Sequence, residues 1–212
     1  MKTENLEKKL VFLRHLETGG NILNKDLGVK FLGRMDPSIM PSSPDSTEKT
    51  KKGIAGCTLF ISSPLKRCIQ TLQLLTENKI ITDSNLLEID YGDVDGLYLK
   101  QAQEKYPQLF DAWKRGEDPR FPNGENSQDV LNRYLNFIQG LKNYPDKSIA
   151  ICSHNVVLRT ALGHSLGISM KEWFKISIPH FEPIYFYLKE CHADYIGPEE
   201  QKRRILKNFQ NN

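Results

Sequence analysis

Four short apolar runs constrain the fold of this chain more than any other feature of its sequence. They cover residues 9–13 (KLVFL), 58–62 (TLFIS), 148–153 (SIAICS) and 183–188 (PIYFYL). Runs of this length that are rich in β-branched and aromatic residues are typical of strands buried within a sheet. Helical patterns separate them, so the sequence predicts strands that alternate with helices.

The segments between these runs carry apolar residues at helical spacing. The stripes cover 65–75, 99–113, 130–141 and 157–166, and Pro107 must interrupt the second of them. Ser63 and Pro64 suit the N-cap and the first residue of the helix after the second run. Segment 24–52 is polar and predicts a loop with a weak helix. These patterns predict an α/β three-layer sandwich, in which a mostly parallel central sheet has helices on both faces and the last strand is antiparallel or at an edge.

Length and charge limit the classes of protein to which the chain can belong. Its 212 residues suit a single domain, 1–212, with a small helical cap over the site inserted at about 97–123. The formal net charge is +3, from 29 basic and 26 acidic residues spread along the chain, which argues against nucleic-acid binding. No apolar run is long enough to span a membrane. The charged start lacks a secretory signal and no two cysteines form a C-x-x-C pair, so we expect a cytoplasmic protein without a zinc or thioredoxin-type site.

Cationic and imidazole side chains follow three of the four predicted strands. Arg14 and His15 come directly after the first, Arg67 lies shortly past the second, and His154 follows the third. Ligands of open α/β sheets bind beyond the carboxyl ends of the strands, so these side chains should converge on one rim. Arginine holds phosphate oxygens through paired hydrogen bonds, and a neutral imidazole can act as a nucleophile. Each residue alone would suit a solvated loop or helix, but together they predict a phosphate site.

Six motifs occur in a fixed order along the chain. The first is Arg14-His15-Leu16-Glu17-Thr18, and the last is Ser153-His154-Asn155. Between them lie 30–36 (KFLGRMD), 62–71 (SSPLKRCIQT), 86–96 (LLEIDYGDVDG) and 124–130 (GENSQDV). In these motifs the chain resembles the histidine phosphatase superfamily, which has the phosphoglycerate-mutase-like fold. The similarity extends from about residue 10 to about residue 188.

The resemblance implies a role for each matching residue. His15 would be a nucleophile that is transiently phosphorylated. Glu88 would protonate the leaving oxygen and then activate water. The residues implied to bind the phosphoryl oxygens are Arg14, Arg67, Asn21, Asn155 and a protonated His154. Because these cations can neutralise the phosphate, we expect the chemistry to need neither a metal ion nor a cofactor.

Two residues differ from the family pattern. Leu16 and Asn155 stand where the family has glycine. Asparagine tolerates a left-handed backbone conformation, whereas leucine does so poorly. We expect Leu16 to keep an ordinary φ and to pack against the sheet. A catalytically weakened relative that binds phosphorylated ligands is the alternative that these two residues leave open.

The remaining histidines are interpreted as structural. Of His164, His180 and His192, the best functional candidate is His180, because it precedes the last strand. A metal site made from the two site histidines and Glu88 is disfavoured, because the neighbouring arginines would repel a cation.

The short insert between Glu88 and Gly124 bears on specificity. It resembles the phosphatase branch, which includes α-ribazole and broad-specificity phosphatases, whereas mutases of this fold carry a longer insert. Phosphoglycerate-mutase-type phosphoryl transfer is the alternative. Candidate substrate contacts are Tyr91, Lys114 and Arg115, although the two cations equally suit a solvated helix end. The implied partner is a small phosphorylated molecule, namely a sugar phosphate, a nucleotide or a cofactor precursor. The oligomeric state is open, with a homodimer as one option.

Overall fold

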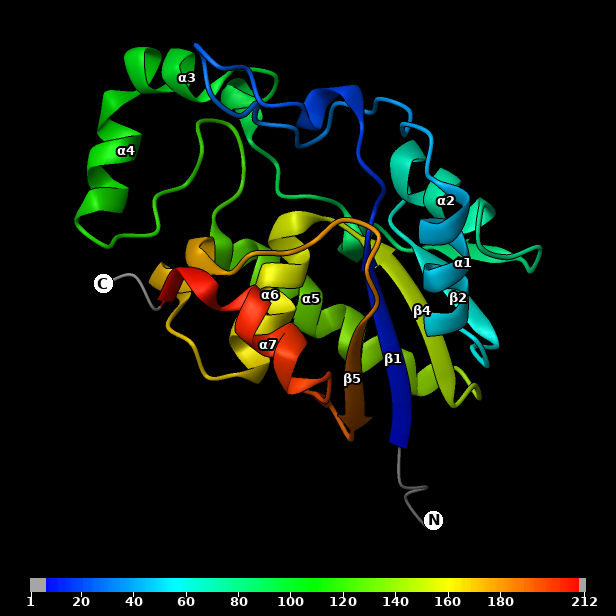
Figure 1. The fold of residues 1–212 in the computed structure, drawn as a ribbon. Coiled ribbons are helices and arrows are strands. Elements are labelled where there is room, and N and C mark those ends of the chain that lie inside the picture. The colour runs from blue at the N-terminus through cyan, green and yellow to red at the C-terminus, as the bar shows by residue number, and fades with distance from the viewer. Residues whose placement is uncertain (1–6, 210–212) are drawn as a thin grey trace.

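The computed structural model describes residues 7–209, which form a mixed sheet of six strands (Figure 1). The strands are β1 (Glu7–Arg14), β2 (Leu59–Ser62), β3 (Ile80–Thr82), β4 (Ser148–Ser153), β5 (Ile184–Lys189) and β6 (His192–Tyr195). Their order across the sheet is β3-β2-β4-β1-β5-β6. The first four of these are parallel, and β5 and β6 are antiparallel to their neighbours.

Parallel pairing brings the carboxyl ends of the central strands to one edge of the sheet. Arg14, the last residue of β1, pairs with Ser153, the last residue of β4. Ser62, which ends β2, pairs with Cys152 of β4. The backbone N–H of His15 then donates to the Ser153 carbonyl at 3.0 Å, which continues the alignment past the strands. The loops after β1, β2 and β4 therefore begin side by side.

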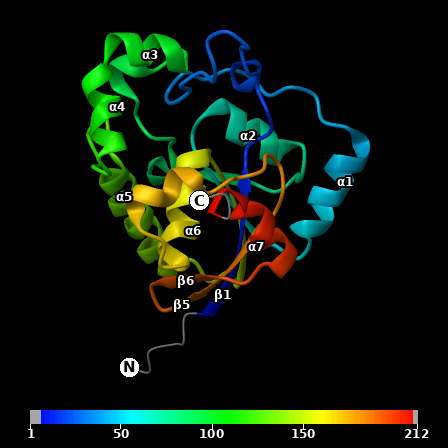
Figure 2. The same ribbon diagram turned by 60° about the vertical axis from the view of Figure 1, so that its left-hand side comes forward.

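Helices cover both faces of the sheet (Figures 1 and 2). They are α1 (Pro44–Gly53), α2 (Lys66–Gln73), α3 (Leu99–Lys105), α4 (Pro107–Lys114), α5 (Ser127–Gly140), α6 (Asn155–Ser165) and α7 (Glu199–Ile205). Short 3₁₀ helices occupy Gly19–Asn21, Ser84–Leu86, Gly92–Val94, Leu141–Asn143, Met170–Lys175 and Lys207–Phe209. No helix within residues 7–209 is both long and apolar enough to cross a membrane.

Alternation of side chains along the strands supplies two separate hydrophobic cores. In β1, Leu10 and Phe12 belong to the core beneath α5 and α6, whereas Val11 and Leu13 belong to the core beneath α2. A strand that is buried on both faces needs apolar residues at nearly every position, which explains the continuous run in the sequence. The predicted three-layer α/β fold is confirmed.

The insert after Glu88 forms a small helical cap above the edge where the central strands end (Figure 1). Its helices α3 and α4 are separated at Tyr106, and Pro107 begins α4, so the proline interrupts the helical stripe as predicted. Ala102, Leu109 and Ala112 are the buried side chains of these two helices. Ala102 and Leu109 belong to the core beneath α5 and α6, and Tyr106, Phe110 and Trp113 pack against it, so the cap is continuous with that core.

The structure corrects the predicted start of α2. Ser63 is not its N-cap and Pro64 is not its first residue, because the helix begins at Lys66 with Leu65 as N-cap. The Ser63 hydroxyl instead lies 2.7 Å from Nε2 of His154, which draws it into the site. The loop between β2 and α2 is thus shaped by a tertiary contact rather than by helix capping.

Two further differences concern the edges of the sheet. The last predicted strand, β5, is antiparallel as expected but lies inside the sheet, because β6 pairs with its outer side. The strands β3 and β6 and the helix α7 were not predicted. β3 has three residues, while β6 (HADY) and α7 (EEQKRRI) are mostly polar, so none has a clear apolar period.

Candidate active site

His15 stands one residue past β1 and has one ring nitrogen with a free lone pair. Its Nδ1 lies 2.6 Å from the carbonyl oxygen of Leu16. A carbonyl only accepts hydrogen bonds, so Nδ1 carries the proton and Nε2 carries the lone pair. Burial, followed by the charge of Arg67, lowers the pKa of His15 well below its ordinary value of 6.5. The imidazole is therefore neutral at physiological pH.

Leu16 keeps an ordinary backbone conformation. The non-glycine residues with positive φ within residues 7–209 are Asn123, Phe181 and Glu190. Leu16 is 8% exposed and packs in the core beneath α2, and its N–H donates to the hydroxyl of Thr71 at 3.0 Å. The expectation that this leucine needs no left-handed backbone and packs against the sheet is confirmed.

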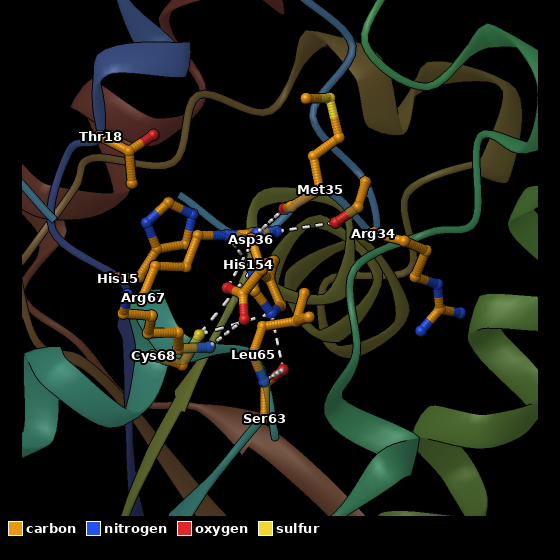
Figure 3. A network of polar contacts seen from close by, with 12 residues as sticks. His15, Thr18, Arg34, Met35, Asp36, Ser63, Leu65, Arg67, Cys68 and His154 are labelled. Carbon is orange, nitrogen blue, oxygen red and sulfur yellow. Dashed lines mark hydrogen bonds and ion pairs between the residues drawn. The ribbon is translucent and has the colours of Figure 1, made fainter. Parts of the chain in front are cut away.

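Arg67 is fully buried at the start of α2 and is held by three protein acceptors (Figure 3). Its Nε donates to Nδ1 of His154 at 3.2 Å, and its Nη atoms donate to the carbonyls of Met35 at 2.6 Å and Gly33 at 2.9 Å. A guanidinium has five N–H donors, so two of them have no acceptor among residues 7–209. Asp36 lies 3.9 Å from Nη1 and balances part of the charge.

His154 follows β4 and is fully buried. Because Arg67 donates to Nδ1, the neutral ring carries its proton on Nε2 and donates to the Ser63 hydroxyl at 2.7 Å. Burial, then Arg67, lowers the pKa of His154 well below 6.5. The prediction of a protonated His154 is therefore wrong for the ligand-free protein, because a second cation is unfavourable at a buried position beside Arg67. A phosphate contact from this ring stays a prediction.

Arg14 is the last residue of β1, and part of its guanidinium makes no hydrogen bond within residues 7–209. Its Nη1 donates to the Ile178 carbonyl at 2.8 Å, while its buried Nε has no hydrogen-bond partner within the described residues. Burial lowers the pKa of Arg14 to about 10, and the charge of Glu88 opposes that effect. A buried donor without a partner is costly. The guanidinium is therefore suited to bind an oxygen acceptor, such as a phosphoryl oxygen.

Glu88 is 4% exposed and sits at the amino end of α6. Its Oε1 accepts from the backbone N–H groups of Ile89 at 3.0 Å and Val156 at 3.1 Å. Its charge also acts on Arg14. The structure therefore brings together His15, Arg14, Arg67, Glu88 and His154, the five residues on which the predicted chemistry depends.

The structure shows the local contacts and backbone conformation of the two asparagines predicted to bind phosphate. The Oδ1 atom of Asn21 accepts from the N–H and the hydroxyl of Thr18, each at 2.9 Å. Asn155 is the first residue of α6 and does not use the left-handed conformation for which asparagine is suited. Their predicted contacts with phosphate remain predictions.

The candidate substrate contacts divide into two groups. Tyr91 packs edge to face against Phe31 and Phe121, with ring centroids 5.0 and 4.8 Å apart, and its pKa is raised by burial and then by Glu88. Lys114 and Arg115 instead form ion pairs with Asp111 and Glu117 on the exposed cap. Tyr91 thus borders the site, while the two cations behave as a solvated helix end.

Arg159 is a site residue that the sequence analysis missed. Its Nε donates to the Ile176 carbonyl at 2.8 Å. Burial lowers its pKa, and the charges of Tyr91 and Glu88 oppose that effect, so the guanidinium lies within electrostatic range of both. The sequence feature that could have indicated it is the single cation in the mostly apolar first nine residues of α6 (NVVLRTALG). It places a third arginine beside the site.

The other histidines also differ in position. The ring of His180 lies 5.3 Å from that of His15, so it belongs to the site. His164 faces His192 at 5.5 Å, and His192 pairs with Asp194 on the surface. Within residues 7–209, no group of three or more His, Cys, Asp and Glu side chains is arranged to hold a metal ion.

Two histidines and two arginines thus gather at the edge where the parallel central strands end. The chain belongs to the histidine phosphatase superfamily (branch 1), whose family profile matches residues 10–190. The resemblance inferred from the six motifs is confirmed.

Similar proteins include both phosphatases and mutases. The chain is 26% identical to phosphoserine phosphatase 1 of Hydrogenobacter thermophilus, with 94% of this chain and 90% of that protein covered. It is also 26% identical to a phosphoglycerate mutase of Schizosaccharomyces pombe, with coverages of 94% and 98%. The α-ribazole phosphatase of Shigella flexneri has the same fold, with a TM-score of 0.71, 20% identity, and coverages of 89% and 94%. The family and these relatives together support a phosphatase or a mutase.

We predict that acid destabilises the protein through its buried neutral histidines. Burial lowers the pKa of His180 to about 4, and those of His15 and His154 are also depressed. The unfolded chain takes up protons as the pH falls below about 6.5, whereas the folded site does not, so folding stability is lost in that window. Each histidine contributes up to about 1.4 kcal/mol per pH unit.

Urea unfolding between about pH 7 and about pH 5 measures this slope. In His180→Asn, the slope of the unfolding free energy against pH should fall by the contribution of roughly one proton. Asn78→Ser, at an exposed residue without an ionisable group, is the control and should leave the slope unchanged. An identical slope in the wild type and the His180 variant would refute the prediction.

A second prediction concerns Leu16→Gly. Loss of a buried leucine should lower the free energy of unfolding by about 2–5 kcal/mol. Because the leucine needs no positive φ, kcat should change by less than about tenfold, or about 1.4 kcal/mol. Steady-state kinetics and chemical denaturation measure the two effects separately. A large gain in kcat would mean that the native residue impairs the site.

Proposed function

We propose that the chain is a metal-independent phosphatase that hydrolyses a small phosphate monoester through a phosphohistidine at His15. The observation that carries the proposal is the fixed, neutral imidazole of His15, with its lone pair on Nε2 and two buried arginines nearby. Phosphoryl transfer depends mainly on positioning and on positive charge around the equatorial oxygens. Arg14 and Arg67 supply both within the described site.

In the first step, the Nε2 lone pair attacks phosphorus and the bond from phosphorus to the leaving oxygen breaks. The carboxyl group of Glu88 gives its proton to that oxygen, so the alcohol leaves neutral. The unpartnered Nε of Arg14 and the two free N–H groups of Arg67 bind the phosphoryl oxygens. This step leaves a phosphohistidine and a Glu88 carboxylate.

In the second step, water attacks phosphorus while the Glu88 carboxylate accepts its proton. The phosphorus–nitrogen bond breaks, which returns the lone pair to Nε2 and releases inorganic phosphate. Glu88 is then protonated again and the cycle can repeat. Backbone N–H groups from Ile89 and Val156 hold this carboxyl group in place for both proton transfers.

The alternatives differ in what they require of the site. A bisphosphate-dependent mutase must hold a second phosphate, but Lys114 and Arg115 are engaged with acids on the cap. The engagement of these two cations favours hydrolysis over mutase chemistry. The short insert is a weaker argument, because the mutase of Schizosaccharomyces pombe matches this chain over 98% of its own length. The weakened-relative alternative loses much of its motivation, because Leu16 has an ordinary backbone conformation.

Arg159 favours a substrate that carries a second, smaller anionic group. It is a partly accessible cation within electrostatic range of Glu88 and Tyr91, on the side where the leaving group would lie. A carboxylate would match its guanidinium through paired hydrogen bonds. The names of similar proteins agree with this chemistry, since they include a phosphoserine phosphatase and a 2-carboxy-D-arabinitol-1-phosphatase. We therefore propose a phosphorylated carboxylic acid as substrate.

The first test of the proposal is turnover of p-nitrophenyl phosphate with excess EDTA. Activity should survive chelation, because the arginines supply the positive charge that a metal would otherwise provide. Vanadate should inhibit, and His15→Ala should reduce kcat by at least about 1000-fold without changing the melting temperature by more than a few degrees. Loss of activity in EDTA with recovery on adding a divalent cation would contradict the proposal, as would a fully active His15→Ala variant.

The second test concerns the substrate class. Arg159→Met should raise KM for phosphoserine by about tenfold or more, because a charge-assisted hydrogen bond is worth about 1.5–3 kcal/mol. For p-nitrophenyl phosphate, which has no carboxylate, kcat/KM should change by less than about threefold. Arg159→Lys keeps the charge and is the matched variant. Equal losses on both substrates would show that Arg159 acts only on the fold.

A further inference from the structure

His180 contacts the proposed nucleophile but takes no part in the two steps above. Its Nδ1 lies 2.7 Å from the backbone carbonyl of His15, and the two rings meet edge to face with centroids 5.3 Å apart. Because the carbonyl only accepts, the Nδ1 of His180 carries the proton. The ring of His154 contacts His15 as well, at 5.2 Å. The nucleophilic ring is thus packed against two other imidazoles.

The segment that carries His180 is fixed to the end of β1. The N–H of Phe181 donates to the Arg14 carbonyl at 2.9 Å, and the Phe181 carbonyl accepts from the hydroxyl of Thr50 at 2.7 Å. Phe181 is buried and has a φ of 57°, which is strained for a residue with a side chain. Strain of this kind persists only where the surroundings impose it, so the placement of His180 is determined by the fold.

We propose that His180 is a positioning residue for His15. By donating to the His15 carbonyl and packing against its ring, it keeps the imidazole where Nδ1–H meets the Leu16 carbonyl and Nε2 is free to attack. Burial keeps His180 neutral, so it adds no repulsion beside Arg14. This inference rests on the proposed function in one respect, since it takes His15 as the nucleophile.

Two substitutions separate the hydrogen bond from the volume of the side chain. The amide of His180→Asn can place an N–H where Nδ1–H now lies, whereas His180→Leu fills space without donating. The Leu variant should lower kcat by about tenfold or more with KM within about twofold, because orientation affects the chemical step. The Asn variant should keep kcat within about threefold of the wild type. His192→Leu, at an exposed position, is the control and should have no effect.

A wild-type kcat in the Leu variant, or an equal loss in both variants, would overturn the role of the hydrogen bond. A second measurement does not depend on turnover: ¹⁵N NMR of the His15 ring should report a single Nδ1–H tautomer in the wild type and the Asn variant, and mixed tautomers in the Leu variant. An unchanged tautomer there would also overturn the proposal. If the Leu variant does not fold, His180→Ala takes its place in both measurements. Absence of turnover in the wild type would refute the proposed function alone.

Discussion

The hydrogen bond from Nδ1 of His15 to the Leu16 carbonyl is the contact on which the rest of the site depends. At 2.6 Å, between a ring and a carbonyl one residue apart, it sets which nitrogen carries the proton. Burial then keeps the ring neutral, so Nε2 retains its lone pair. The carbonyl can serve this purpose because Leu16 is anchored, through its buried side chain and its bond to Thr71. The sheet supplies the rigid frame, since β1 and β4 end together.

Electrostatics complete the arrangement around this ring. Three imidazoles and two arginines lie close together in buried surroundings, which would be unfavourable if the imidazoles were charged. Their depressed pKa values remove that conflict in the ligand-free protein. The positive charge of the arginines remains, and Arg14 and Arg67 keep N–H groups that have no acceptor within the described part of the chain. A phosphate dianion would therefore meet fixed donors without displacing a competing cation.

Much of the fold and the core of the site could be predicted from the sequence, because both follow from strand ends. The apolar runs located β1, β2, β4 and β5, and parallel pairing necessarily brought His15, Arg67 and His154 to one edge. The protonation state of His154 could not be predicted, since it depends on an Nε atom of Arg67 that arrives from another helix. For a similar reason, the sequence did not indicate Arg159 as a site residue, and His180 was interpreted as structural. Each resembles an ordinary polar residue in its own segment and gains a role only through a tertiary contact.

Trapping the phosphoenzyme tests the central claim most directly. A labelled monoester would be mixed with the enzyme, quenched in base during turnover and digested, and the modified nitrogen would be identified by mass spectrometry and ³¹P NMR. The account predicts one phosphoryl group, on Nε2 of His15, because Nδ1 is occupied by its bond to the Leu16 carbonyl. A phosphoryl group on Nδ1, on His154 or on His180, or steady turnover with no covalent intermediate, would contradict it.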